Sequence, residues 1–414
     1  MNIINTLKLA KASSLAMALA TTSVKNEALE KIAVELENGV QEILRGNQLD
    51  LTNAIANGVS QSLQDRIMLD EKRIHALAEA VRVIKQLPDP VGDSVRGMKL
   101  QNGLNVQQVR VPFGVIGCIY EARPNVTVDI ATLAIKSGNA AVLRGGSAAE
   151  NTNQILNSLI QSGLKKAGLP AEAICSVDEF GREGAVELMK ARDYVDVLIP
   201  RGSANLIKTV VAESTVPVIE TGSGVVHIFV DESADLNQAL PIIMNSKVQR
   251  PSVCNALETL LVHEAVAEQL LPLLAQELEA SAVTVHACEK SQALIPRSIR
   301  ATEEDWATEY HSLELAIRVV TGLDEALDHI AEYSTKHTDS ILTEDIGNAE
   351  KFLAEVDSAV VMVNASTRFT DGGEFGFGAE VGISTQKLHA RGPMGLSELT
   401  STKWLVRGRG QIRN

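Results

Sequence analysis

The 414-residue sequence lacks a hydrophobic run long enough to cross a bilayer, so we expect no membrane-spanning helix and no membrane partner. It is also short of positive charge, with 38 Lys and Arg against 52 Asp and Glu and a formal net charge of −14. An acidic protein repels the phosphate backbone, which argues against nucleic acid as a partner. A locally basic pocket for a small anionic ligand is still compatible with this charge.

Cysteines are few and scattered, and none stands at the paired spacing of a metal site. The four are Cys118, Cys175, Cys254 and Cys288. Their scatter favours a reducing compartment over a disulfide framework. Residues 14–20 have some features of a signal peptide, but this apolar stretch is short and helix-compatible sequence continues past it. We therefore expect a cytoplasmic protein without a metal ion.

The usual dinucleotide-binding fingerprint, G-x-G-x-x-G after the first strand, is absent as well. Three other glycine-rich junctions follow predicted strands, at residues 144–147, 202–203 and 220–224. Such junctions can present backbone N–H groups to phosphates, although each is also compatible with an ordinary turn. The third junction carries an acid, Glu220.

The first part of the chain is predicted to be helical. Apolar residues recur at helical spacing up to about Gln86, and two prolines then end the helices. A hairpin is predicted over residues 99–111, with Asn102-Gly103 at its turn. Because a two-stranded ribbon is only marginally stable alone, we expect the hairpin to pair with another segment.

The rest of the chain alternates between predicted strands and helices. Strands are predicted at residues 114–120, 140–143, 174–177, 195–199, 216–219, 257–262, 283–287, 313–320 and 359–364. This alternation is typical of parallel sheets covered by helices on both faces. The sequence therefore predicts an α/β protein with two units joined near Asp231, without internal repeats or a low-complexity linker.

One cysteine lies in a sequence context that favours chemistry. Pro251 cannot sit inside a helix, so Cys254 is predicted in a connection or at the entrance of the following strand. Lys247 and Arg250 are close in sequence, and nearby cations make a thiol easier to ionise. The alternative is a small buried residue, the usual place of an isolated cysteine.

Several segments resemble a known family. Residues 122–125, 142–147, 200–203, 220–224 and Cys254 resemble, in order and approximate spacing, the aldehyde dehydrogenase superfamily. Residues 120–127 (Tyr-Glu-Ala-Arg-Pro-Asn-Val-Thr), 326–341 and 375–385 resemble one branch of it, the gamma-glutamyl phosphate reductase family. The resemblance covers essentially the whole chain.

The resemblance implies an aldehyde dehydrogenase-like fold, with two parallel-sheet α/β domains and a small oligomerisation β-element. The implied parts are an NADPH-binding domain at 1–92 and 113–230, an oligomerisation hairpin and tail at 93–112 and 390–414, and a catalytic domain at 231–389. We expect the tail around Trp404 to pair with a neighbouring subunit, which would make the protein a homo-oligomer.

The resemblance also assigns roles to residues of the catalytic step. Cys254 matches the nucleophile, whose thioester is a good hydride acceptor. Asn125 matches the side chain that stabilises the oxyanion together with the backbone N–H of Cys254. Alternatively, Asn125 caps the helix that follows it, and both roles are compatible.

Further residues match the family's cofactor contacts. Arg144, Gly145, Gly146 and Ser147 match the region that contacts the adenosine ribose, Gly202 and Ser203 the pyrophosphate turn, and Glu309 a contact to the nicotinamide ribose. An acid at position 147 would repel a 2′-phosphate, so Arg144 with Ser147 favours NADPH. Glu309 could equally be a solvated glutamate. Glu220 matches the general base of hydrolytic relatives, a role that a reductase does not need.

The substrate is expected to need an anion site. Arg123, Lys247 and Arg250 are the candidates, against the alternative that each is structural or solvated. Arg250 suits bidentate phosphate binding best. His337, in a polar segment, is a candidate for the substrate pocket, whereas His329 lies on a helical pattern and is expected to pack.

The implied reaction is the NADPH-dependent reduction of L-glutamyl 5-phosphate to L-glutamate 5-semialdehyde, with release of phosphate, through a thioester on Cys254. It belongs to proline biosynthesis and invites a functional association with glutamate 5-kinase. A hydrolytic NAD(P)-dependent aldehyde dehydrogenase is the nearest alternative, supported by Glu220. A cysteine acyl hydrolase would need a base aimed at Cys254, and no motif supplies one. Intact Cys254 and Asn125 argue against an inactive binding module.

Overall fold

The computed structural model describes residues 2–121 and 123–413 and divides them into two compact units. Ala122, within the motif at 122–125, lies outside the described residues. The first unit comprises residues up to Glu220 with Gly376–Gly382 and the segment from Met394 onward, and the second comprises Thr221–Phe375 and Ile383–Pro393. The sequence had placed the junction near Asp231. It comes earlier because the next strand, β7 (Val226–Val230), is fully buried in the sheet of the second unit.

Five helices open the first unit, as the helical spacing predicted. They are α1 (Ile3–Leu19), α2 (Thr22–Asn38), α3 (Val40–Ala56), α4 (Gln61–Ile67) and α5 (Glu71–Gln86). Side chains at their starts, such as Asn2 and Asp70, accept hydrogen bonds from backbone N–H groups of the first turn. Leu7 and Met17 of α1 are fully buried, so the stretch that had some features of a signal peptide forms part of this unit's core.

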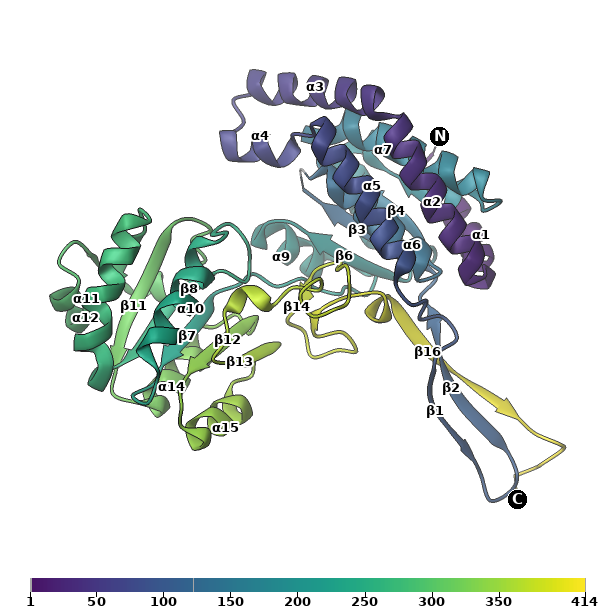
Figure 1. The fold of residues 1–414 in the computed structure, drawn as a ribbon. Coiled ribbons are helices and arrows are strands. Elements are labelled where there is room, and N and C mark those ends of the chain that lie inside the picture. Colours follow the sequence, from purple (N-terminus) through teal and green to yellow (C-terminus); the bar gives the residue numbers. More distant parts are fainter. Residues whose placement is uncertain (1, 122, 414) are drawn as a thin grey trace. The chain divides into compact units, whose positions relative to one another are not determined.

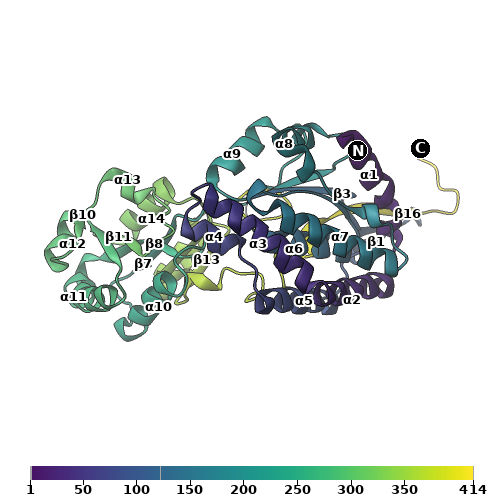
Figure 2. The same cartoon turned by 90° about the horizontal axis from the view of Figure 1, so that it is seen from above.

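A four-stranded parallel sheet in the order β5-β4-β3-β6 forms the centre of the first unit. Its strands are β3 (Val115–Tyr120), β4 (Ala140–Arg144), β5 (Ile174–Ser176) and β6 (Val197–Arg201). The helices between and after them are α6 (Pro124–Lys136), α7 (Glu150–Lys166), α8 (Gly181–Lys190) and α9 (Ala204–Glu213). Helices α2, α3 and α5 pack against α6 and α7, which lie on the sheet (Figure 1, Figure 2).

The strand predicted at 216–219 is absent as a regular strand. Only a single bridge, between Leu198 and Val218, forms there. The apolar pattern of this segment instead buries Val216 and Ile219 without a continuous ladder.

The first unit also carries an antiparallel ribbon in the order β1-β2-β16 (Figure 1). Its strands are β1 (Ser94–Lys99), β2 (Asn105–Pro112) and β16 (Thr400–Arg407). Strand β16 pairs with β2 of its own chain, with Trp404 opposite Gln108, and forms one edge of the ribbon, so the expected pairing of the tail with a neighbouring subunit stays a prediction. The hairpin thus finds its partner almost 300 residues along the same chain, and Gln411 bonds the carbonyl of Asn102 at its turn with an N···O distance of 3.0 Å.

A seven-stranded parallel sheet in the order β10-β9-β11-β8-β7-β12-β13 forms the centre of the second unit. Besides β7, its strands are β8 (Leu257–His263), β9 (Thr284–Ala287), β10 (Ile299–Arg300), β11 (Glu314–Val320), β12 (Thr338–Leu342) and β13 (Val360–Val363). The sequence analysis missed β7, β10 and β12. Strand β12 begins with three buried polar residues, and the carboxylate of Asp339 is accommodated because it accepts hydrogen bonds from His227, Ser334 and Ser358.

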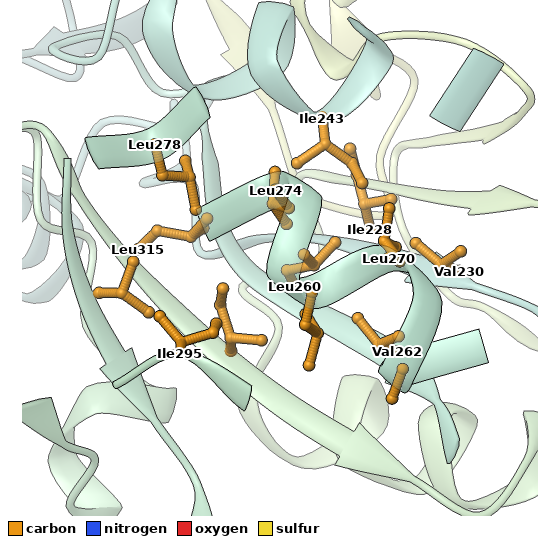
Figure 3. Packing of buried hydrophobic residues seen from close by; sticks show 14 of the residues in the cluster. Ile228, Val230, Ile243, Leu260, Val262, Leu270, Leu274, Leu278, Ile295 and Leu315 are labelled. Carbon is orange, nitrogen blue, oxygen red and sulfur yellow. The ribbon is translucent and has the colours of Figure 1, made fainter. Parts of the chain in front are cut away.

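Six helices cover this sheet: α10 (Leu236–Val248), α11 (Glu264–Ala280), α12 (Glu289–Leu294), α13 (Glu303–Trp306), α14 (Leu323–Tyr333) and α15 (Ile346–Glu355). Leu270, Leu274 and Leu278 of α11 point into one apolar cluster with side chains of β7, β8 and β11 (Figure 3). Burying each such leucine contributes roughly 1.5–3 kcal/mol. The cluster stabilises both α10 and β8, the two elements that the segment around Cys254 connects.

Short elements complete the chain. Two-residue strands β14 (Ile383–Ser384) and β15 (Gly392–Pro393) pair in the second unit, and 3-10 turns lie at 147–149, 171–173, 178–180, 367–369 and 397–399. Within residues 2–121 and 123–413, no helix combines the length and the apolarity needed to cross a membrane.

Candidate active site

Cys254 lies in the connection between α10 and β8, as predicted, and its side chain is partly buried. The chain of residues 222–224 passes directly beside it. A Cβ built on Gly224 would lie 1.6 Å from the carbonyl oxygen of Cys254, so only glycine allows this approach. The third glycine-rich junction therefore packs closely against the backbone of Cys254.

Glu309 holds this junction in place. Its Oε1 accepts the N–H of Gly224 at 2.7 Å, and its Oε2 lies 3.3 Å from Nε2 of His311. The Glu309 side chain is only 12% exposed, which makes a merely solvated glutamate a poor description. The predicted contact to a nicotinamide ribose stays a prediction, and the contact to Gly224 is a positioning role that the sequence did not reveal.

Lys247 does not present its charge to a ligand. Its ammonium is fully buried and lies 2.6 Å from Oε2 of Glu258, which is buried too. Burial lowers the pKa of Lys247 and raises the pKa of Glu258 to about 7, while their mutual attraction opposes both shifts. Of the two interpretations offered by the sequence, the structural one describes Lys247, because a cation neutralised inside the protein is a poor anchor for phosphate.

Two arginines lie near the thiol instead. Arg250 is exposed and lies in the same connection, four residues before Cys254. Arg368 is partly buried, and its guanidinium donates from Nε to Gln249 at 2.9 Å and from Nη1 to Asn255. Burial lowers the pKa of Arg368, and Arg250 acts in the same direction, whereas Asp371 and the Cys254 sulfur raise it. The two guanidinium groups and the thiol therefore share one electrostatic environment.

Arg368 borders a polar cavity of about 210 Å³ in the second unit. The cavity is lined by Asn245, Gln249, Arg368, Phe369, Asp371 and Glu374. The sequence analysis missed Arg368, since it lies far along the chain from Cys254. The one available signal was its position in a polar, glycine-containing stretch directly before the motif at 375–385.

The two histidines of the family signature are both buried. His337 has its Nδ1 2.9 Å from the Thr338 hydroxyl, and burial lowers its pKa to about 4, so it stays neutral near pH 7. The structure gives no support to His337 as a residue exposed to a substrate pocket. The packing role expected for His329 is confirmed: its ring contacts His227, Trp306 and Tyr333, and burial lowers its pKa to about 2.

In the first unit, Asn125 lies in the opening turn of α6. The helix begins at Pro124 and Arg123 is its N-cap residue, so the capping alternative for Asn125 does not hold. The Asn125 amide instead donates from Nδ2 to Oδ2 of Asp129 at 3.0 Å. Burial raises the pKa of Asp129 to about 6, and the Asn125 bond opposes this rise. Asp129 thus fixes the orientation of the Asn125 amide, while Arg123 is exposed just before the helix.

The first unit also contains a cavity of about 490 Å³ at the ends of β3, β4 and β6, next to α8 and α9. Its lining includes two residues predicted to bind the cofactor, Arg144 and Ser203. It also includes Arg182 of α8, which sequence reasoning missed because no motif surrounds it. The lining also includes Glu121 and Glu213, so the two arginines face two acids at this cavity.

The turn after β4 needs its first glycine. A Cβ on Gly145 would lie 2.1 Å from Nδ2 of Asn153, and the Gly145 N–H donates to the partly buried carboxylate of Asp178 at 2.6 Å. Gly146 follows and precedes a 3-10 turn that begins at Ser147, whose side chain is exposed. The turn therefore leads from Arg144 to an exposed hydroxyl.

The turn after β6 already holds an anionic group. The Ser203 N–H and hydroxyl donate to the two oxygens of the Glu121 carboxylate at 2.9 and 2.7 Å, at the start of α9. A Cβ on Gly202 would lie 2.8 Å from that carboxyl group. A carboxylate at a helix N-terminus indicates a turn suited to anions. Glu220, the last residue of the first unit's main segment, is partly buried.

The predicted site residues therefore form one group in each unit. Cys254, Glu309 and Arg250 belong to the second unit, together with the newly found Arg368. Asn125, Arg123, Glu220 and both predicted phosphate turns belong to the first. Among the described residues, no cluster of His, Cys, Asp and Glu is suited to hold a metal ion.

Comparison with known proteins places these features in a family. The sequence model of the Aldehyde dehydrogenase family matches residues 2–310. A gamma-glutamyl phosphate reductase of Leifsonia xyli subsp. xyli is 60% identical over 405 residues, which cover 98% of this chain and 96% of that protein. Its counterpart in Clostridium novyi is 52% identical over 411 residues, or 99% of each chain.

Solved structures give the same result. The crystal structure of gamma-glutamyl phosphate reductase from Thermotoga maritima superposes with a TM-score of 0.98 at 48% identity and covers 100% of both chains. An acetylating aldehyde dehydrogenase from Geobacillus thermoglucosidasius shares the fold, with a TM-score of 0.71 at 19% identity over 100% of this chain and 97% of that one. The chain belongs to the aldehyde dehydrogenase family, and within it to the gamma-glutamyl phosphate reductases.

Proposed function

We propose that this protein reduces L-glutamyl 5-phosphate to L-glutamate 5-semialdehyde with NADPH, releasing phosphate, as an oxidoreductase of proline biosynthesis. The observation that carries the proposal is likeness over the full length: relatives named gamma-glutamyl phosphate reductase match 98–99% of the chain at 52–60% identity. The local geometry supports it, because Glu309 fixes Gly224, whose backbone packs closely against that of Cys254.

Cys254 is the proposed nucleophile. Its thiolate attacks the acyl carbon, a C–S bond forms, and the C–O bond to phosphate breaks with the electron pair leaving on phosphate. The Asn125 amide and the Cys254 backbone N–H donate to the oxyanion that develops on the acyl oxygen. Asp129 contributes by holding the Asn125 amide in one orientation, since the hydrogen bond between them restricts its rotation.

The family implies a nicotinamide cofactor, and the residues of the first unit fit one. When bound, NADPH supplies a hydride to the thioester carbon. The cavity of about 490 Å³ offers Arg144 and Arg182, and guanidinium groups suit a 2′-phosphate. The Ser203 turn suits a pyrophosphate, since its N–H and hydroxyl already hold a carboxylate. We infer NADPH rather than NADH from the two arginines and the absence of an acid at Ser147.

Phosphate leaves, or enters in the reverse direction, next to the thiol. Arg250, exposed and electrostatically linked to Arg368 near Cys254, is the proposed phosphate ligand of the second unit, with Arg123 a candidate from the first. Lys247 is no longer a candidate, because its ammonium pairs with Glu258.

A second candidate function is hydrolytic aldehyde oxidation. Glu220 favours it, since an acid there matches the base that activates water in hydrolytic relatives. The two functions differ in what resolves the thioester, which is phosphate in one and water in the other.

The reverse reaction tests the proposal. L-Glutamate 5-semialdehyde, phosphate and NADP⁺ should give the acyl phosphate, NADPH and a proton, so that NADPH absorbance rises only when phosphate is present. Arsenate should replace phosphate, and Arg250→Ala should raise the KM for phosphate more than that for NADP⁺. Steady NADPH formation without phosphate or arsenate would instead establish the hydrolytic function with Glu220 as base.

We further infer a homo-oligomer. The ribbon β1-β2-β16 has two edge strands, and both expose apolar side chains, among them Val95, Met98, Trp404 and Val406. Exposed edges of this kind are suited to extension by a second copy. We also propose a cytoplasmic location, where free thiols stay reduced, and a functional association with the kinase that supplies the acyl phosphate.

A further inference from the structure

We propose that the polar cavity lined by Arg368 binds the α-carboxylate and α-ammonium groups of the glutamyl substrate. Arg368 takes the carboxylate, and Asp371 and Glu374 take the ammonium. The inference rests on the proposed function for the identity of the substrate. It adds the residues that select an amino acid among other acyl phosphates and aldehydes.

The loop that carries Arg368 is firmly attached to the segment that carries the thiol. The Thr367 hydroxyl donates to the carbonyl of Asn255 at 2.8 Å, and the Asn255 amide donates to the carbonyl of Thr370 at 2.8 Å. These three residues are buried, and Asn255 directly follows Cys254. Arg368 is therefore held at a fixed place beside Asn255, the residue that follows Cys254.

The guanidinium of Arg368 is itself oriented. Its Nε donates to Gln249 at the end of α10, and its Nη1 donates to Asn255. Hydrogen bonds to two neutral amides fix its plane without neutralising its charge. A fixed, planar and charged fork matches the geometry of a carboxylate.

The charges around the cavity match a zwitterion better than a phosphate. Asp371 and Glu374 line the same cavity as Arg368. Two acids would repel a doubly charged phosphate, but they attract an ammonium group placed beside a carboxylate. The Asp371 side chain is held in place because its Oδ1 accepts the N–H of Gly373 at 2.8 Å.

The size and place of the cavity suit this head group. Its volume of about 210 Å³ is roughly seven times that of a water molecule in the liquid, enough for an amino acid head group with some water. In a glutamyl chain, three C–C bonds separate the acyl carbon from the α-carbon, a span of about 4 Å. The α-carbon must therefore lie within about 4 Å of the acyl carbon, and the cavity is bordered by Arg368, which contacts the residue that follows Cys254.

Aldehydes that lack one group each can separate the contacts. The reverse assay would compare L-glutamate 5-semialdehyde with 5-oxopentanoate, which lacks the amino group, and 4-aminobutanal, which lacks the carboxylate. Arg368→Ala should raise the KM for the first two roughly tenfold to hundredfold, the usual worth of a hydrogen bond to a charged group, and leave that for 4-aminobutanal unchanged. The KM for phosphate should not change. A rise confined to the phosphate KM would overturn the proposal and make Arg368 a phosphate ligand.

The acids should show the opposite selectivity. Glu374→Gln and Asp371→Asn should raise the KM for L-glutamate 5-semialdehyde and for 4-aminobutanal. They should leave the KM for 5-oxopentanoate unchanged. Equal effects of these variants on all three aldehydes would refute the ammonium contact. Glu374 is exposed, so its substitution does not threaten the fold.

Two further measurements protect the test. Arg368→Lys keeps the charge but loses the planar fork, so its KM for L-glutamate 5-semialdehyde should lie between those of wild type and Arg368→Ala. This variant also serves as the test if Arg368→Ala folds poorly. Arg300→Ala replaces an exposed arginine on β10 in the same unit and should behave like wild type.

Calorimetric binding of L-glutamate needs no turnover: wild type should bind it and Arg368→Ala should not. A wild type that reduces the acyl phosphate, with unchanged L-glutamate binding in Arg368→Ala and Arg368→Lys, would refute the subsite while the proposed function stands. A wild type that binds L-glutamate through Arg368 but lacks the reverse reaction would refute the function alone.

Discussion

The two groups of candidate catalytic residues are held in different ways. In the first unit, Asn125 is oriented by Asp129, four residues further along the same helix. In the second, the surroundings of Cys254 come from distant parts of the sequence, through the contacts of Glu309 with Gly224 and of Arg368 with Asn255. The Asn125–Asp129 pair can form as soon as α6 forms, whereas the contacts around Cys254 require the folded second unit. Substitutions at the first pair should therefore affect only that helix turn, and substitutions around Cys254 should also disturb segments distant in sequence.

The largest expected effect comes from removing the thiol. Cys254→Ala should lower turnover by about 10⁴-fold or more, since no other group can form the thioester. NADPH binding, followed by its fluorescence, should be nearly unchanged, because the cavity with Arg144 and Arg182 belongs to the first unit. Cys288→Ala is the matched control and should stay active. Turnover near the wild-type rate in Cys254→Ala would disprove covalent catalysis.

A smaller loss is expected at the oxyanion donor. Asn125→Ala should lower kcat by about 10²–10³-fold with little change in the KM for NADPH, as for other oxyanion donors. Asp129→Asn keeps an oxygen that can accept from Asn125 and should lose far less. Steady-state kinetics of both variants, with thermal unfolding as a control, checks this. Equal losses would mean that the Asp129 charge, rather than its acceptor, matters.

The effect on cofactor preference should be smaller than the effect of Asn125→Ala on kcat. If both arginines bind the 2′-phosphate as proposed, Arg144→Gln and Arg182→Gln should each lower kcat/KM for NADPH roughly tenfold and leave that for NADH nearly constant, because each would lose one charged contact. Ser147→Glu should act in the same direction through repulsion. Measuring both cofactors with each variant decides the matter. An unchanged preference would place the 2′-phosphate elsewhere.

The smallest effect concerns stability and pH. The pKa of Asp129 is raised from 3.8 to about 6 in the folded protein, mainly by burial. The folded state therefore keeps a proton that the unfolded state releases, so this group's contribution to stability falls as pH rises from about 4 to about 6 and is constant above. Urea unfolding at pH 4, 5, 6 and 7 should show a shallower fall in Asp129→Asn than in wild type. Identical pH profiles would indicate that Asp129 is solvated.

Local patterns explain what the sequence could predict. The helices up to Gln86, the sheet of the first unit, strands β8, β9, β11 and β13 of the second, and the connection holding Cys254 follow from apolar spacing, caps and a proline, all of which act over a few residues. Strand β12 escaped prediction because Asp339 inside it is satisfied by His227, which lies on another strand. Lys247 and Arg368 show the same limit. Closeness in sequence suggested Lys247 for the anion site, but Glu258 neutralises it, and the arginine that reaches the cavity lies over one hundred residues away.

The pairing of β16 with β2 has a consequence for synthesis on the ribosome. Strand β2 is made early, but its partner strand leaves the exit tunnel only after the entire second unit. Until then β2 presents an unpaired edge, a template for wrong pairing with other nascent chains. Chains that stop short of residue 400 should therefore aggregate, and the first unit can close only after the second has been made.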